Sequence, residues 1–289
     1  MQINANTNDE FPTLSTNSGE IKNSGFDLPM AYDVIRSKDL NLSVNLVGNY
    51  NKQEIIDLPT DTGEIINPDG IGSIGLQEGG LINEYFLVRY VGVNQENGNL
   101  LFLDADGNET ENPDVDTDRV FLGTNLAPDF QGSVGFDLNY RGLFFSTQWN
   151  YAIGIDRIDN DLANFSDPTN IGQFRATGDL LRAWTPENTN TDMPSLTATN
   201  IALDGNSDRF LQSADFLRLR FATAGYDLPS RYLDGTGLNR IRVFVQGENL
   251  LTFTPWRGFD PETVNTFNPA QSRLFPTPKV FSVGLEVGF

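Results

Sequence analysis

Apolar and polar residues alternate with a period of two along seven stretches of the chain. In one of them, Leu40, Leu42, Val44 and Leu46 share a face, and Asn41, Ser43 and Asn45 share the other. This period is typical of β-strands that have one apolar and one polar face. The predicted strands are residues 24–35, 40–51, 131–140, 143–153, 214–228, 240–252 and 279–289.

Two of the predicted strands are irregular. Residues 24–35 contain Pro29, which cannot donate to a strand ladder and therefore indicates an edge strand or a bulge. In residues 214–228 the apolar positions change phase near Phe221, which predicts a bulge or a switch of face. We expect an open, curved antiparallel sheet whose edge strands are 24–35 and 279–289.

The connections between these strands alternate between short and long. The short ones are 36–39, 141–142 and 229–239, and the long ones are 52–129, 154–213 and 253–278. Structureless loops beyond about 15 residues are unusual in compact soluble domains. Within the long stretches we expect a small hairpin from residues 84–93 and 99–104, and a short helix over residues 178–184.

Short turns at one end and long loops at the other are typical of outer-membrane β-barrels, whose strands carry lipid-facing and lumen-facing residues in turn. A soluble antiparallel sheet with one wet face would show the same alternation, so the loop lengths are what favour the barrel. Single-chain bacterial barrels have an even strand count. Seven strands are therefore expected to be the last part of a barrel, with residues 1–22 as the end of an extracellular loop and 23–289 as barrel.

Composition excludes several classes of function. The 289 residues carry a net charge of -20, which argues against a nucleic-acid partner. There is no His and no Cys, so catalysis by either residue and the usual zinc and copper ligands are excluded. No apolar run approaches the roughly 18 residues of a transmembrane helix. The polar start of the sequence carries no signal peptide, which fits an incomplete barrel.

Several motifs resemble the C-terminal portion of the SusC/RagA family of TonB-dependent outer-membrane transporters of the Bacteroidetes type. They are "NSGEIKNSGFDL", "RAWTPENTNTDMPSL", "ADFLRLRFATAGYDLP", "IRVFVQGENLLTFTPWRGFDPE" and "LFPTPKVFSVGLEVGF", together with a looser match over residues 101–146. They span nearly the whole chain in the family's order. The "TPENTNTDMP" and "VQGENLLTFT…GFDPE" stretches are the most specific.

The resemblance implies a β-barrel of about 22 strands around an N-terminal plug, in the bacterial outer membrane. It also implies nutrient uptake driven through a TonB box, and a SusD-like lipoprotein lid that captures glycans or peptides. This chain would supply the closing wall and three large outer loops, and would lack the plug and the TonB box. We therefore expect a part of an importer that does not transport alone and is not an enzyme.

The terminal strand is the first candidate site. Phe281, Val283, Leu285, Val287 and Phe289 share one face up to the last residue. The family resemblance implies that barrel-assembly machinery recognises this strand. The same side chains could also be no more than lipid-facing positions of the wall.

Two further candidate sites lie in the long loops. Asp104, Asp106 and Asn108 offer oxygen ligands to Ca²⁺, but the spacing departs from an EF-hand, since Gly107 falls too early and Val115 replaces the twelfth-position Glu. A solvated acidic loop is the competing interpretation. Trp184 and Trp256 could stack on a sugar or fill a binding pocket, or each could pack its own loop.

Two other classes of function remain as alternatives. One is a soluble β-sandwich that binds glycans. The other is a carbohydrate-active enzyme with paired carboxylates, although no constellation in the sequence points to such a pair. On the barrel interpretation, a set of charges faces the lumen and pairs with neighbours or water: Asp137, Arg242, Glu248 and Glu286.

Overall fold

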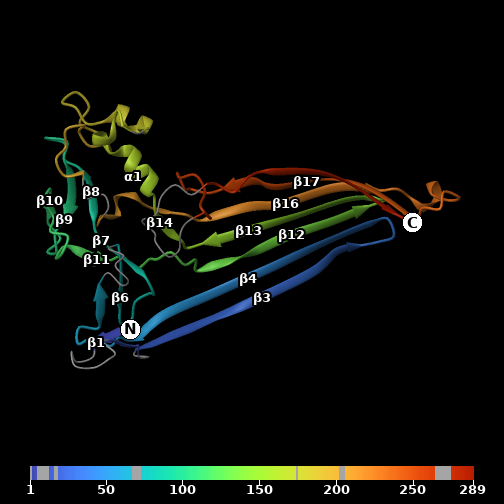
Figure 1. Ribbon diagram of the computed structural model, residues 1–289, viewed down its shortest axis with the longest axis horizontal. Coiled ribbons are helices and arrows are strands. Elements are labelled where there is room, and N and C mark those ends of the chain that lie inside the picture. The colour runs from blue at the N-terminus through green and yellow to red at the C-terminus, as the bar shows by residue number, and fades with distance from the viewer. Residues whose placement is uncertain are drawn as a thin grey trace. The chain divides into compact units, whose positions relative to one another are not determined.

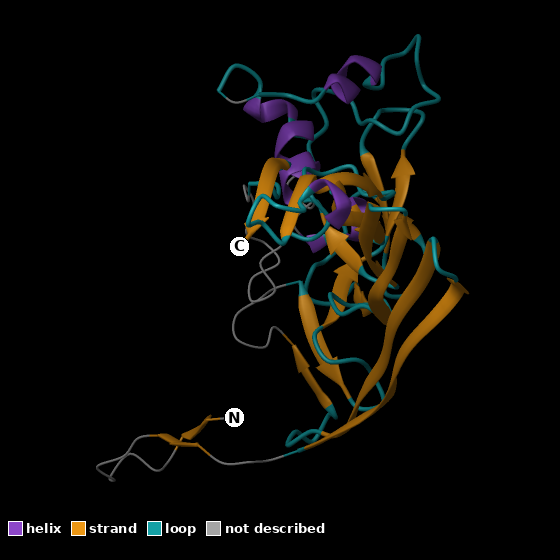
Figure 2. Ribbon diagram, turned by 90° about the vertical axis from the view of Figure 1, so that its right-hand side faces the viewer, coloured by secondary structure: helices purple, strands orange, loops and turns teal. Residues whose placement is uncertain are grey.

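The computed structural model describes residues 19–66, 73–173, 175–201, 206–263 and 275–289, and the backbone of 2–4 and 13–15. Strands predominate in this part of the chain, and its helices are short (Figure 2). The chain divides into two compact units. We call residues 25–51, 127–164 and 210–289 the sheet unit, and residues 1–24, 52–126 and 165–209 the loop unit.

The sheet unit is built on one seven-stranded antiparallel sheet (Figure 1). Its order is β3-β4-β12-β13-β16-β17-β18, so β3 and β18 are the edges. The strands are β3 (Glu20–Arg36), β4 (Leu40–Asp57), β12 (Phe130–Tyr140), β13 (Leu143–Ile153), β16 (Phe216–Asp227), β17 (Arg240–Phe253) and β18 (Val280–Gly288). All seven predicted strands are confirmed, and so are the predicted edges.

A bulge in β16 confirms the predicted change of phase. On the β13 side Gln148 pairs with Phe221 and Trp149 pairs with Leu219, so Arg220 is an extra residue. On the β17 side the register also shifts between Leu219 and Phe221. The bulge resets the alternation, because two successive residues take the same side of the sheet. Leu217, Leu219, Ala222, Ala224 and Tyr226 therefore share one face of the sheet, whereas Phe216 and Phe221 lie on the other.

The predicted short connections are present. Arg141 and Gly142 form a two-residue turn between β12 and β13, with φ values of 48° and 92°. Positive φ at both central residues matches the right-handed twist of the two strands. Between β16 and β17 the link contains the 3₁₀ helix η6 (Ser230–Tyr232).

The remaining elements of the sheet unit include a helix that the sequence did not predict. Strands β14 (Asp156–Ile158) and β15 (Leu211–Ser213) form a two-stranded ribbon. Helix α1 (Asn160–Ser166) follows β14, and the Asp159 carboxylate accepts a bond of 2.9 Å from the backbone N–H of Leu162. Asp159 thus caps the helix start. None of the helices in the described ranges is long and apolar enough to cross a membrane.

The loop unit has two small sheets of its own. One has the order β11-β7-β6-β5, from β5 (Glu64–Ile66), β6 (Ile74–Gln77), β7 (Glu84–Val88) and β11 (Arg119–Phe121). The other has the order β10-β9-β8, from β8 (Tyr90–Val93), β9 (Leu100–Leu103) and β10 (Glu109–Thr110). The predicted hairpin is the β8–β9 pair, and the predicted short helix is the 3₁₀ helix η3 (Gly178–Arg182).

The core of the loop unit joins segments that are far apart in the sequence. Val88, Leu100, Phe102 and Ile201 are buried together, and Leu100 and Phe102 have no exposed surface. Further 3₁₀ helices are η2 (Pro168–Asn170) and, at the boundary of the unit, η5 (Asp208–Phe210). Strands β1 (Gln2–Asn4) and β2 (Thr13–Ser15) pair with each other. The rest of the predicted terminal loop segment 1–22 lies largely outside the described residues.

Candidate functional site

One face of the seven-stranded sheet is apolar and exposed, and we call it the apolar face. Strand register places its members on one side, since Val245 pairs with both Ala224 and Val283. Its side chains include Met30, Tyr32, Val34, Phe136, Leu143, Phe145, Leu217, Tyr226, Val243, Val245, Leu251, Phe281, Val283 and Leu285, with exposures from 38% to 81%. An apolar surface this wide marks contact with lipid or a partner.

The opposite face of the sheet carries the polar side chains of the strands together with Phe144, Phe221 and Phe244, and we call it the inner face. Asp137 accepts a bond of 2.5 Å from the Ser146 hydroxyl. Glu248 accepts one of 3.0 Å from the amide of Gln246. These two predicted lumen charges therefore pair with residues of the same wall.

The other two predicted lumen charges form ion pairs on the inner face. Arg242 donates two bonds to Asp227, of 2.7 and 2.6 Å, in the bidentate geometry that suits guanidinium and carboxylate groups. Glu286 pairs with Arg240 at 3.2 Å. Near the short turns, the charges of the inner face are therefore paired with one another.

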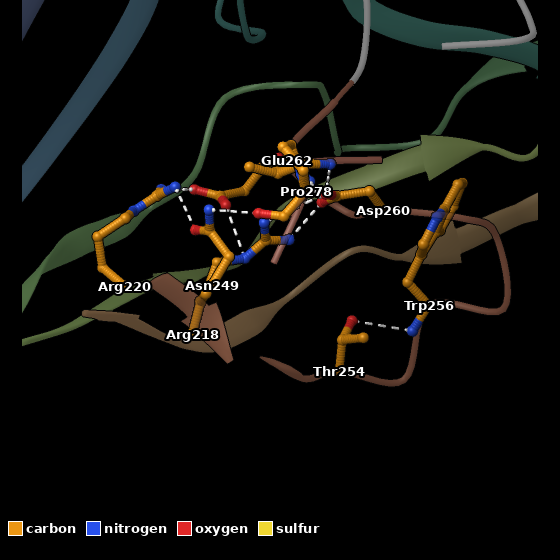
Figure 3. Close-up of polar contacts among 9 residues, drawn as sticks. Arg218, Arg220, Asn249, Thr254, Trp256, Asp260, Glu262 and Pro278 are labelled. Carbon is orange, nitrogen blue, oxygen red and sulfur yellow. Dashed lines mark hydrogen bonds and ion pairs between the residues drawn. The ribbon is translucent and has the colours of Figure 1, made fainter. Parts of the chain in front are cut away.

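A denser group of charges lies where β16 and β17 meet the loop that follows β17 (Figure 3). We call Arg218, Arg220, Asn249, Asp260 and Glu262 the charge cluster. Arg218 donates through both terminal nitrogens to Asp260, one bond being 3.2 Å, and its Nε lies 2.8 Å from Glu262. Arg220 donates to Glu262 at 2.5 Å and to the Asn249 side-chain oxygen at 3.1 Å.

Strand alternation explains why two arginines meet here. Arg218 and Arg220 are two positions apart and share the inner face, so their charges repel unless anions cover them. Asp260 and Glu262 have the same spacing in the loop and meet the arginines. Asn249, opposite the bulge, takes the left-handed conformation with a φ of 54°, which asparagine tolerates better than most residues.

The centre of the charge cluster is buried. Arg218 is 2% exposed and Asp260 is 6% exposed. Burial alone would raise the pKa of Asp260, but the hydrogen bonds from Arg218 and from the backbone N–H groups of Glu262 and Thr277 outweigh it and hold the pKa below its ordinary value. Asp260 is therefore a carboxylate at neutral pH, as its pairing with Arg218 requires.

Four of the five residues of the predicted assembly signal lie in the edge strand β18, and the fifth is the residue that follows it. Phe281, Val283, Leu285 and Val287 alternate along β18 on the apolar face, and Phe289 follows. Phe281 is 76% exposed and Phe289 is 87% exposed. The Asn239 side chain donates to the Phe289 carbonyl at 2.6 Å and fixes the end of the chain to the turn before β17. Recognition of this strand by assembly machinery stays a prediction.

The predicted calcium ligands form the turn between β9 and β10. The Asp104 carboxylate accepts hydrogen bonds from the backbone N–H groups of Asp106 and Asn108, at 3.0 and 2.8 Å. These bonds engage the carboxylate within its own turn. The Asn108 bond is the main reason that the pKa of Asp104 is lowered. Within the described ranges, no group of three or more acidic residues is placed to hold a metal ion. The calcium site stays a prediction.

The two predicted substrate-binding tryptophans belong to different units. The indole N–H of Trp184, in the loop unit, donates to the Gln95 carbonyl at 3.0 Å. Its ring lies on Gly98, where an added Cβ would come within 2.7 Å. In the sheet unit, Trp256 lies against Gly258 and both follow β17. Trp184 thus packs against the other long loop, 52–129, whereas Trp256 packs its own loop, and each ring is partly exposed.

The charge cluster is the site that our sequence reasoning did not assemble. Its members come from Arg218-Leu219-Arg220 and Asp260-Pro261-Glu262, which are about 40 residues apart. The available signal was the matched spacing of opposite charges, one pair in a strand and the other in the loop after the neighbouring strand.

Comparisons with known proteins agree with this architecture. No family model matches the chain. It is 28% identical to TonB-dependent receptor P3 of Formosa agariphila over 94% of its own length, and 24% identical to TonB-dependent receptor P39 of that organism over 96%. It covers 29% and 31% of those proteins, so it spans less than a third of their length.

Solved structures give the same result. The RagAB peptide transporter matches 96% of this chain with a TM-score of 0.84 and 26% identity, and 30% of its own chain is covered. The RagAB peptide importer in the open-open state matches the whole chain with the same TM-score, and 31% of it is covered. The predicted resemblance to SusC/RagA-type TonB-dependent transporters and the all-β barrel-segment fold are both confirmed.

Proposed function

We propose that this chain, a relative of TonB-dependent receptors and of the RagAB transporter, forms part of the wall and the outer loops of a bacterial outer-membrane importer. The observation that carries the proposal is the pairing of an exposed apolar face with a polar inner face on one seven-stranded sheet. A barrel that spans an outer membrane needs such a wall, with lipid outside and water or a plug inside.

The alternative of a soluble β-sandwich fits this sheet less well. A sandwich buries the apolar face of each sheet against the other. Here Val245 and Val283, in the middle of paired strands, are 53% and 81% exposed. Contact with lipid explains this exposure, whereas a soluble glycan-binding module would have to leave these apolar side chains in water.

The relatives support a proposal for the solute and the partners. The neighbours described as peptide transporters support oligopeptides as one class of solute, and glycans are the other class that the family resemblance implies. Import is driven through the TonB complex, which engages a part of the importer outside this chain. A SusD-like lipoprotein captures the solute at the outer loops, where Trp184 and Trp256 are candidate contacts. The chain carries no enzymatic step.

Biogenesis is part of the same proposal. The terminal strand with Phe281 and Phe289 exposed is the element offered to the barrel-assembly machinery. The Asp104 turn is a solvated acidic loop, and bound Ca²⁺ is the competing assignment there. Each of these roles can be tested separately from import.

The experiment is an uptake comparison in a bacterium that carries the gene. A deletion strain and a complemented strain are supplied with fluorescent oligopeptides or fluorescent oligosaccharides, with and without a protonophore. We expect the deletion to abolish uptake of one of the two probe sets, and the protonophore to have the same effect in the complemented strain. Recovery of the protein in the soluble fraction, or unchanged uptake of both sets, would contradict the proposal.

A further inference from the structure

We propose that the charge cluster is a latch that fixes the loop after β17 to the inner face of the wall, so that this loop is a static part of the importer's outer mouth. The loop in question is residues 254–263 and 275–279. The assignment goes beyond the proposed function, because a barrel wall and its loops require no such fastening. It rests on three features of the cluster.

The first feature is that both limbs of the loop are tied to the same point. The Asp260 carboxylate accepts the Arg218 guanidinium from β16 and the backbone N–H of Thr277, at 2.9 Å, from the returning limb. Asn249 at the bulge donates to the carbonyl of Pro278, at 3.1 Å. Two attachments to the wall and one bond between the limbs restrain the loop more than a single ion pair could.

The second feature is the balance of buried charge. Two arginines face two carboxylates, and the side chains of Arg218 and Asp260 are each only 3% exposed. Removing one partner of a buried pair leaves an uncompensated charge, which is far more costly than the loss of an exposed pair. Lifting the loop would uncover both arginines at the bulge, so the closed position is strongly favoured.

The third feature is that the large apolar side chain beside the charge cluster does not anchor the loop. Phe259, next to Asp260, is 62% exposed, so its ring is not what holds the segment down. The charge cluster, with the buried Pro261 between its two acidic residues, therefore holds this part of the loop in position.

A spin-label measurement tests the latch without using transport. Because the chain has no Cys, the variant Phe259→Cys takes a single nitroxide label at an exposed position. In the protein extracted from outer membranes, we expect a strongly restricted spectrum for this label. Adding Asp260→Asn should increase the ratio of mobile to restricted label about 100-fold, as the loss of one partner of a buried ion pair implies.

Two further variants make the result decisive. Arg240→Ala removes the ion pairs of Arg240 with Glu286 and Asp227 at the start of β17, and it should leave the label restricted. Glu262→Gln weakens the latch more mildly and replaces Asp260→Asn if the latter fails to assemble. A label that is mobile in the parent, or one that stays restricted in both cluster variants, would overturn the latch. Because no uptake is measured, a wrong import assignment would not alter this result.

Discussion

Replacing Val245 by Arg is the sharpest test of the two-faced wall. Val245 is five residues beyond Arg240, the first residue of β17, and it lies on the apolar face. Strands rise about 3.3 Å per residue, so it is about 17 Å along the strand. With a tilt of about 40°, its height is about 13 Å, close to the middle of an apolar band about 25 Å tall.

The expected cost follows from that depth. An arginine on the lipid face of a barrel costs about 2 to 4 kcal/mol at the midplane and about 0 to 1 kcal/mol near the interface. Val245→Arg should therefore lower the folding equilibrium constant by about 30- to 700-fold, since 1.4 kcal/mol is tenfold. Ile241→Arg, on the same face but one residue from the strand start, should cost less than 1 kcal/mol.

The matched control is the neighbouring inner-face position. Gln246→Arg gives up a bond of 3.3 Å from Thr223 but places the new charge beside Glu248, so we expect a cost below about 1 kcal/mol. The assay is urea titration of the purified protein in phospholipid vesicles, with the folded fraction read from the gel mobility of unheated samples. Equal costs at Val245 and Gln246 would refute the assignment of one face to lipid.

Three other predictions concern the loop unit, the charge cluster and the chain end. Phe102→Ala should destabilise the loop unit by about 3 to 5 kcal/mol, because the ring is fully buried. Limited proteolysis should then cut the loop unit faster while the sheet stays intact. An unchanged rate of cleavage would contradict the assignment of Phe102 to the core. The depressed pKa of Asp260 stabilises the latch above the ordinary carboxyl pKa of 3.8, and this contribution disappears as the pH falls through the lower folded value, so a label at Phe259 should become mobile only in acid. Removal of Phe289 should lower the amount of assembled protein in outer membranes, and normal assembly would exclude its part in the assembly signal.

The sheet could be predicted from the sequence because the alternation that identifies each strand is a local pattern. A period of two over about ten residues identifies a strand with two different faces, and all seven such stretches are strands of one sheet. The phase change near Phe221 also predicted the bulge. The predicted strands 24–35 and 40–51 were shorter than β3 and β4. The additional residues, such as Lys52 and Glu54, are polar and follow no apolar alternation.

The features that were missed depend on context. Helix α1 has only seven residues, and its sole strong signal was the capping residue Asp159. The charge cluster joins β16 to a loop about 40 residues away, and no local pattern specifies which acidic residues of a chain with 39 of them will meet a given arginine. The likeness of spacing between Arg218-x-Arg220 and Asp260-x-Glu262 becomes informative only once the strands are paired.

The most direct test of the account is an accessibility scan along β17. Single cysteines are introduced from residue 241 to residue 246, which is possible because the chain has none of its own. Each is labelled with a nitroxide, and its collisions with oxygen, which enriches in lipid, are compared with those of a water-soluble nickel complex. We predict lipid exposure at 241, 243 and 245, and protection from oxygen at 242, 244 and 246. Access of the nickel complex to all six positions would contradict a membrane wall.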